Sequence, residues 1–134
     1  MSWEVGQSLN PLVKPAITAE QLKEYAAASG DNNPIHLDQK FARDAGFPSV
    51  IVHGMISMAF MGDHLLFNFP TAQYRLGRIK ARFRKVTFPG DVLSCEGKIK
   101  KSLPDNGLVV SLATRNQNGE VTTDGEAEVF AKDE

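Results

Sequence analysis

The sequence has very little cysteine. Cys95 is the single cysteine among 134 residues, so no disulfide can form within the chain. A lone thiol is typical of a protein kept in a reducing compartment. The first residues, Met1 to Gly6, also lack the cationic start and the apolar run of a signal peptide. We therefore expect a cytoplasmic protein.

Long hydrophobic runs and an excess of one charge are also missing. The longest apolar stretch, around Met55 to Gly62, is far shorter than the roughly 20 residues that a membrane-spanning helix needs. The net charge of -1 provides no overall field that attracts nucleic acid or an anionic membrane. We expect neither partner. Because the chain also lacks repeats and linkers, its length and its 42% hydrophobic residues predict one domain over residues 1–134.

The first half of the chain predicts helices. Thr18 can cap the start of a helix, with Gln21 as the capping-box partner, and this helix should end near Gly30. A short helix is expected over residues 39–45, inside an otherwise irregular stretch. Residues 54–67 are apolar on nearly every face up to Gly62, which is typical of a central helix enclosed by other structure.

From residue 78 onward the sequence takes the period of two that is typical of a strand with one buried face. Apolar residues alternate there with a row of cations: Arg78, Lys80, Arg82 and Arg84. Further strands are expected over residues 92–100, 108–116 and 121–131, with turn signals between them. A buried helix followed by antiparallel hairpins predicts an α+β fold in which the sheet wraps round the helix.

Two polar residues in the irregular stretch form a candidate acid-base pair. Asp31 and His36 are five positions apart across Pro34, in a loop that leaves the first helix. A carboxylate and an imidazole held together there could share a water molecule and move its protons. Pro34 restricts the loop, and the Asn33 amide can tie it to nearby backbone groups. The alternative is an Asp that caps a turn and a His that bonds to the backbone.

A second candidate element is His53-Gly54-Met55 at the start of the central helix. Unpaired N–H groups and the positive end of the helix dipole can stabilise an oxyanion there, and Gly54 permits a close approach of a ligand to the backbone. His53 is interpreted as a structural histidine in preference to a direct participant. We expect no metal site, because Asp31, His36 and Asp38 have no Cys partner and no ligand spacing such as His-x-x-x-His.

The order of these residues resembles the signature of the MaoC-like (R)-specific enoyl thioester hydratases and dehydratases. The matching residues are Tyr25-Ala26, Ser29-Gly30-Asp31, Asn33-Pro34-Ile35-His36, Asp38, Ala42, Gly46-Phe47, Ile51 and His53-Gly54-Met55. A looser match covers residues 83–91. The resemblance implies a hotdog fold, a homodimer with the acyl tunnel near the subunit interface, and no metal or redox cofactor.

The resemblance also implies roles for individual residues. Asp31 and His36 would hold the catalytic water, Asn33 would order the loop, and the Gly54 amide would bond to the thioester carbonyl. The neighbouring residues expected to bind substrate or order the loop are Ser29, Asn33, His53 and Met55. The implied activity is the interconversion of trans-2-enoyl and (R)-3-hydroxyacyl thioesters, carried by coenzyme A or acyl carrier protein. Which of the two groups transfers which proton stays open.

Two further alternatives remain open at this point. The cations Arg78, Lys80, Arg82 and Arg84 could contact the phosphates of coenzyme A or an acidic carrier protein, but a solvated sheet face explains them equally well. Instead of a hydratase, the chain could be a non-catalytic acyl-thioester-binding hotdog subunit or a hotdog thioesterase.

Overall fold

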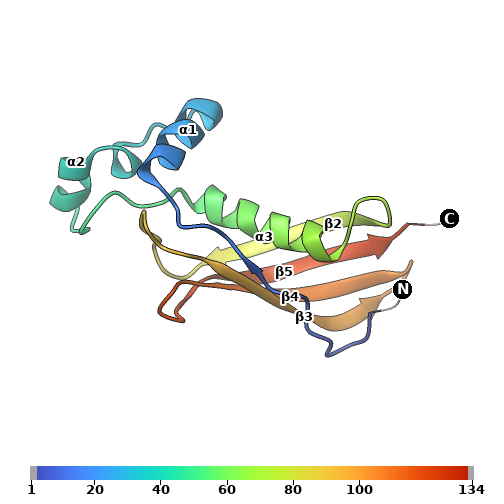
Figure 1. The fold of residues 1–134 in the computed structure, drawn as a ribbon. Helices are drawn as coiled ribbons and strands as arrows, with labels where there is room; N and C mark the ends of the chain where they lie inside the picture. The colour runs from blue at the N-terminus through green and yellow to red at the C-terminus, as the bar shows by residue number, and fades with distance from the viewer. Residues whose placement is uncertain (1–2, 133–134) are drawn as a thin grey trace.

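The computed structural model describes residues 3–132, in which a long helix lies against one face of an antiparallel sheet (Figure 1). The helix is α3 (Gly54–Asn68), and the strands are β1 (Leu12–Val13), β2 (Tyr74–Phe83), β3 (Ser94–Leu103), β4 (Gly107–Arg115) and β5 (Val121–Ala131). Their order across the sheet is β1-β3-β4-β5-β2. The predicted α+β arrangement, with the sheet curled round a central helix, is confirmed.

The position of β2 differs from the sequence-based expectation of consecutive hairpins. Only β3, β4 and β5 pair in sequence order, whereas β2 crosses over and pairs antiparallel with the last strand, β5. This pairing places cations opposite acids: Arg78 faces Glu128, Lys80 faces Glu126 and Arg82 faces Asp124. Opposite charges in register stabilise a strand pair, which gives a physical reason for this order.

Two small helices form an outlying segment beyond the N-terminal end of α3 (Figure 1). Helix α1 (Ala19–Ser29) has the predicted capping box between Thr18 and Gln21, and it ends at Gly30 in the left-handed conformation, with φ 81°. Helix α2 (Gln39–Asp44) also forms where it was expected. A short 3₁₀ helix over Pro34–His36, which the sequence did not predict, lies between them.

The core lies between α3 and the sheet. One cluster joins Met61 and Leu65 of α3 to Ile99, Val110 and Val129 of three strands. A second cluster joins the N-terminal part of α3 to α1 and α2 through Ile56, Phe60, Leu22 and Ala42. The outlying helices are therefore held on the start of α3 by apolar packing.

Helix α3 is less enclosed than its sequence predicted. Three of its apolar side chains are about half exposed: Met55 at 55%, Leu66 at 49% and Phe67 at 57%. Phe83 at the end of β2 is 55% exposed, although the strand alternation placed it on the buried face. Leu76 of β2 is exposed as well. Since β2 is also the last strand of the described sheet, this side of the domain combines a free strand edge with apolar side chains.

Over residues 3–132, the structure contains no helix with the length and apolar character needed to cross a membrane.

A buried polar cluster attaches the N-terminal segment to α3. His64 is fully buried, and its Nε2 donates to the Asn10 carbonyl oxygen at 2.8 Å. The Asn68 side chain accepts from the Asn10 amide at 2.8 Å and donates to the same carbonyl at 2.9 Å. His64 is therefore a structural residue, as its position far along the helix suggested.

We expect this cluster to make the protein sensitive to acid. Burial lowers the pKa of His64 from 6.5, and the hydrogen bond to Asn10 only partly opposes this. The unfolded chain therefore binds a proton more readily, so the free energy of unfolding falls as pH drops below about 6.5. His64→Gln, which keeps a donor for Asn10, should reduce this pH dependence. Urea unfolding at pH 7.5 and 5.5 measures it, and an unchanged dependence in the variant would contradict the assignment.

Candidate active site

The loop that leaves α1 is held by a series of side chain to backbone hydrogen bonds. The Ser29 hydroxyl accepts from the Asp31 amide at 3.1 Å, the Asp31 carboxylate accepts from the Asn33 amide at 3.3 Å, and the Asn33 side chain accepts from the Ile35 amide at 3.1 Å. Such bonds lock turns. Their geometry fits the loop-ordering role expected of Ser29 and Asn33.

The ring of His36 is oriented by the backbone of a distant segment. Its Nδ1 donates to the Ile51 carbonyl oxygen at 2.7 Å. The neutral imidazole therefore carries its hydrogen on Nδ1, which leaves the Nε2 lone pair free to accept a proton. His36 is half-buried while Asp31 is exposed, so a water molecule can reach both groups.

His53 supports both members of this pair. It is 1% exposed, its Nε2 donates to the Asp31 backbone carbonyl at 3.2 Å, and its ring stacks on the His36 ring with centroids 3.8 Å apart. The Tyr25 ring also packs against the His53 ring, with centroids 4.7 Å apart and the planes tilted by 59°. Burial lowers the pKa of His53, the nearby His36 adds to this, and the hydrogen bond to Asp31 opposes it. A neutral His53 that positions Asp31 and His36 agrees with its structural interpretation.

Three side chains come together here: one possible metal-ligand atom from each of Asp31, His36 and His53 lies within 4.8 Å of the other two. This confirms that the two members of the candidate pair are neighbours in space. The same three groups fit a metal ion poorly, because the two rings are stacked with an interplanar angle of 23°. Their in-plane lone pairs then run side by side and do not converge on one point. One nitrogen of each ring also bonds to a backbone carbonyl.

A pocket of about 270 Å³ joins His36 to the start of α3. Gly54 lines it as the first residue of the helix, and His53 before it makes no side-chain cap. The Gly54 N–H has no acceptor within its own helix and is therefore available to a ligand. The Phe83 ring covers this glycine so closely that an added Cβ would lie 3.2 Å from it. An oxygen atom could thus be held at Gly54 beside a water molecule at His36.

The comparison with known proteins decides the family. The family model described as "MaoC like domain" matches residues 2–123. The chain belongs to the MaoC-like family. The (R)-specific enoyl-CoA hydratase of Aeromonas caviae is 32% identical over 131 residues, covering 96% of this chain and 95% of that protein. The mitochondrial 3-hydroxyacyl-[acyl-carrier-protein] dehydratase of Arabidopsis thaliana is 34% identical over 114 residues, covering 82% of this chain and 68% of the plant protein.

Solved structures confirm the hotdog fold of this MaoC-like protein. The unliganded R-hydratase of Pseudomonas aeruginosa superimposes with a TM-score of 0.88 and 33% identity, covering 98% of this chain and 84% of that one. The Aeromonas caviae (R)-hydratase has a TM-score of 0.87 and 30% identity, with 98% of each chain covered. Other relatives are far longer: the chain spans only 9% of the mouse peroxisomal multifunctional enzyme type 2.

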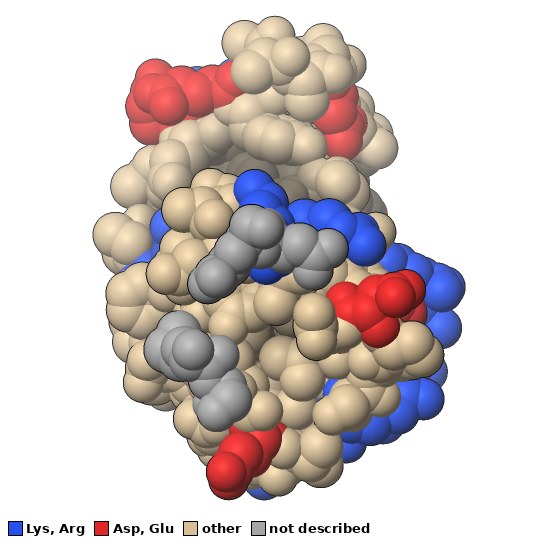
Figure 2. Space-filling model, turned by 90° about the vertical axis from the view of Figure 1, so that its right-hand side faces the viewer, with Lys and Arg blue, Asp and Glu red and all other residues tan. Residues whose placement is uncertain are grey.

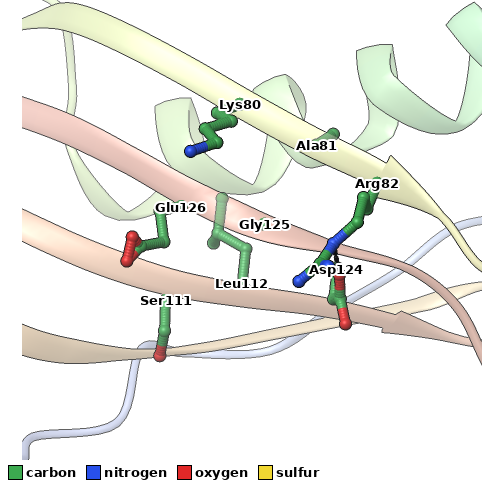
Figure 3. A pocket seen from close by; sticks show the side chains of 8 residues that line it. All are labelled: Lys80, Ala81, Arg82, Ser111, Leu112, Asp124, Gly125 and Glu126. Atoms are coloured by element: carbon green, nitrogen blue, oxygen red, sulfur yellow. Dashed lines mark ion pairs between the residues drawn. The ribbon is translucent and has the colours of Figure 1, made fainter.

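The row of cations lies mostly away from the MaoC-like pocket. Figure 3 shows Lys80 and Arg82 over a groove on the face of the sheet opposite α3, beside Glu126 and Asp124, with an ion pair between Arg82 and Asp124. Arg78 lies on the same strand, in register with Glu128. In Figure 2, Lys and Arg side chains gather along the right-hand side of the molecule, with one group of acidic side chains among them.

Arg84 is the one member of that row that lines the pocket with His36 and Gly54. Its Nε lies 3.0 Å from the Asp124 carboxylate. Lys85, which was not a candidate, lines the same pocket and pairs with Glu120 at 2.7 Å. Met55 was a candidate, but its side chain is largely exposed and it is not among the residues that line the pocket.

Several pocket residues escaped the sequence analysis: Ser57, Phe83, Thr87 and Thr123. Ser57 carried a signal, because it is a hydroxyl one turn after Gly54 inside an apolar helix. Phe83 and Thr87 lie within the looser match over residues 83–91, but strand alternation does not reveal which residues meet at a helix terminus, and Thr123 had no signal.

Proposed function

We propose that this MaoC-like protein is a hydro-lyase that interconverts trans-2-enoyl thioesters and (R)-3-hydroxyacyl thioesters. The observation that carries the proposal is the joint position of His36 and Gly54 on one pocket, with Asp31 beside His36. Relatives that cover most of the chain are named (R)-specific enoyl-CoA hydratase and 3-hydroxybutyryl-CoA dehydratase, which supports the same chemistry.

The geometry divides the reaction between two sides of the pocket. The Gly54 N–H donates to the thioester carbonyl and draws electrons from the double bond, which makes C3 electrophilic. Water held by Asp31 and His36 adds its oxygen to C3 and gives one proton to the pair, and the pair returns a proton to C2. Dehydration follows the same path in reverse. We assign the transferred proton to the pair and not to one of the two residues.

The test is hydration of trans-2-butenoyl-CoA by the purified chain. The absorbance of the conjugated thioester should fall, and chiral analysis should find the (R)-3-hydroxy product. A thioesterase would release free thiol, which a thiol-reactive dye detects. A non-catalytic binding subunit would bind the thioester without either change. Thiol release or an unchanged absorbance would overturn the proposal.

We also propose that Arg84 and Lys85, at the rim of the pocket, contact a phosphate of the thioester carrier. Both are partly exposed and each is held by an acid, Asp124 or Glu120. Arg84→Gln should raise KM for butenoyl-CoA about three- to tenfold, because a rim-exposed charged hydrogen bond is lost. The N-acetylcysteamine thioester, which has no phosphate, should be affected less. Lys80→Gln on the outer sheet face serves as control and should leave KM unchanged.

A second comparison distinguishes the carriers. Turnover on matched enoyl-CoA and enoyl-acyl-carrier-protein substrates shows which carrier the enzyme prefers. An equal rise of KM for the truncated thioester in Arg84→Gln would mean that Arg84 acts on the pocket itself and not on a phosphate.

The homodimer remains part of the proposal. Its support is the free edge of β2 next to exposed apolar side chains, among them Leu76 and Phe67, because unpaired strand edges and apolar patches favour association. Sedimentation equilibrium should give twice the mass of the chain, and Leu76→Lys should shift the equilibrium toward the monomer. Val13→Lys should not, because Val13 is also exposed, at 62% against 46% for Leu76, but lies on the opposite edge strand. A monomeric wild type would contradict this arrangement.

A further inference from the structure

The pocket beside His36 and Gly54 contains three hydroxyl side chains from three separate parts of the chain. Ser57 comes from α3, Thr87 from the connection between β2 and β3, and Thr123 from β5. Their exposed fractions are 4%, 4% and 1%. Together with His36, Arg84 and Lys85 they form the polar part of the pocket lining.

These three hydroxyls have no hydrogen-bond partner among residues 3–132. Other buried threonines of the chain do: the Thr122 hydroxyl donates to the Thr114 carbonyl at 3.3 Å. The fully enclosed side-chain N and O atoms that lack a partner in the described chain belong to Trp3, His53 and His64, so the three hydroxyls are not among them. Because all three residues line the pocket, their hydroxyls are available to bond to what fills it.

A buried hydroxyl without a partner is unfavourable, so water must occupy this part of the pocket before substrate binds. An acyl chain that extends past C3 into this space displaces that water, and its methylene groups offer the hydroxyls no replacement. Each hydroxyl left without a partner lowers affinity by about tenfold. A short acyl group leaves the water in place. The volume of about 270 Å³ is also small for a ligand pocket, which usually measures about 300–1,000 Å³.

We propose that Ser57, Thr87 and Thr123 make this pocket selective for enoyl thioesters with a short acyl group, of about four carbons, against long unbranched chains. The inference rests on the proposed function for the identity of the reacting thioester. It names the substrate class of that site and adds three specificity-determining residues to it.

The test compares kcat/KM for trans-2-butenoyl-CoA and trans-2-octenoyl-CoA. The wild type should favour the four-carbon substrate. Thr87→Val and Thr123→Val remove a hydroxyl at nearly constant shape, and each should raise the ratio of the eight-carbon to the four-carbon substrate by about tenfold. Thr122→Val is the matched control, since Thr122 neighbours Thr123 on β5 but is not among the pocket-lining residues. It should leave the ratio unchanged.

A second measurement needs no turnover. Calorimetric binding of butanoyl-CoA and octanoyl-CoA to the full chain should show the same preference, and the same shift in the two Val variants. If neither enoyl thioester is hydrated, the proposed function fails, while the binding ratio still tests the pocket. The inference is overturned if the wild type prefers the eight-carbon ligand, or if the folded Thr87→Val and Thr123→Val variants keep the wild-type ratio.

Discussion

Asp31→Asn and His36→Gln should each lower kcat for hydration of butenoyl-CoA by about 10²- to 10⁴-fold, the usual contribution of a positioned acid or base. An Asn amide cannot take a proton from water, yet its oxygen can still accept from the Asn33 amide as the Asp31 carboxylate does at 3.3 Å. The loop should thus keep its shape while the chemistry is lost. Single-turnover kinetics separate this loss from weaker binding.

A nearby carboxylate provides the control for this experiment. Asp38 also lies in the loop region, but it caps α2 by accepting from the Lys40 and Phe41 amides at 3.0 and 3.2 Å. Asp38→Asn retains a capping side chain, and its activity should stay near that of the wild type. If the folded Asp31→Asn and His36→Gln proteins were both as active as Asp38→Asn, the reacting water would have to be bound elsewhere.

Gly54→Pro should reduce kcat by about 10²- to 10³-fold, because it removes the N–H that we assign to the thioester carbonyl. The first position of a helix tolerates proline well. His53 before it has ψ 132°, the extended conformation that a following proline favours. Helix α3 should therefore form normally. The loss should appear in kcat more than in KM, since the bond strengthens as charge develops on the carbonyl oxygen.

The matched control for proline is Gly54→Ala. Alanine keeps the N–H but adds the same Cβ, which would lie 3.2 Å from the Phe83 ring. Because Phe83 is more than half exposed, its ring can move a little, and we expect only a small loss of activity. Comparable losses in the Ala and Pro variants would show that crowding by Phe83, and not the missing N–H, is responsible.

Short-range features of the fold were predictable from sequence because they depend on neighbouring residues. The capping box of Thr18 and Gln21 marked the start of α1 to the residue, and Gly30 marked its end. The turn before β4 has Asp105 and Asn106 with φ 63° and 59°, as its turn signal indicated. Caps and turns are local hydrogen-bonding arrangements, so adjacent side chains determine them.

Long-range features escaped prediction. Alternation identified β2 as a strand but not its partner β5, because many strand pairs satisfy the same period of two. The cations of β2 suggested a binding surface, but their acidic partners Asp124 and Glu126 are more than 40 residues away in sequence. The sequence also indicated an enclosed α3, whereas Met55 and Phe67 are exposed on the open side of the domain.

For the site itself, the sequence was enough to predict Asp31 and His36 as the reacting groups and Gly54 as the backbone donor, and the structure brings Asp31 close to His36 and places His36 and Gly54 on one pocket. These lie in one short loop and at one helix start, where residue type and turn chemistry are informative. Only the tertiary structure decided what surrounds them: the stacking of His53 on His36, and the hydroxyls of Ser57 and Thr123 in the pocket. Those contacts depend on how distant elements pack, and side-chain patterns along a single element do not encode that packing.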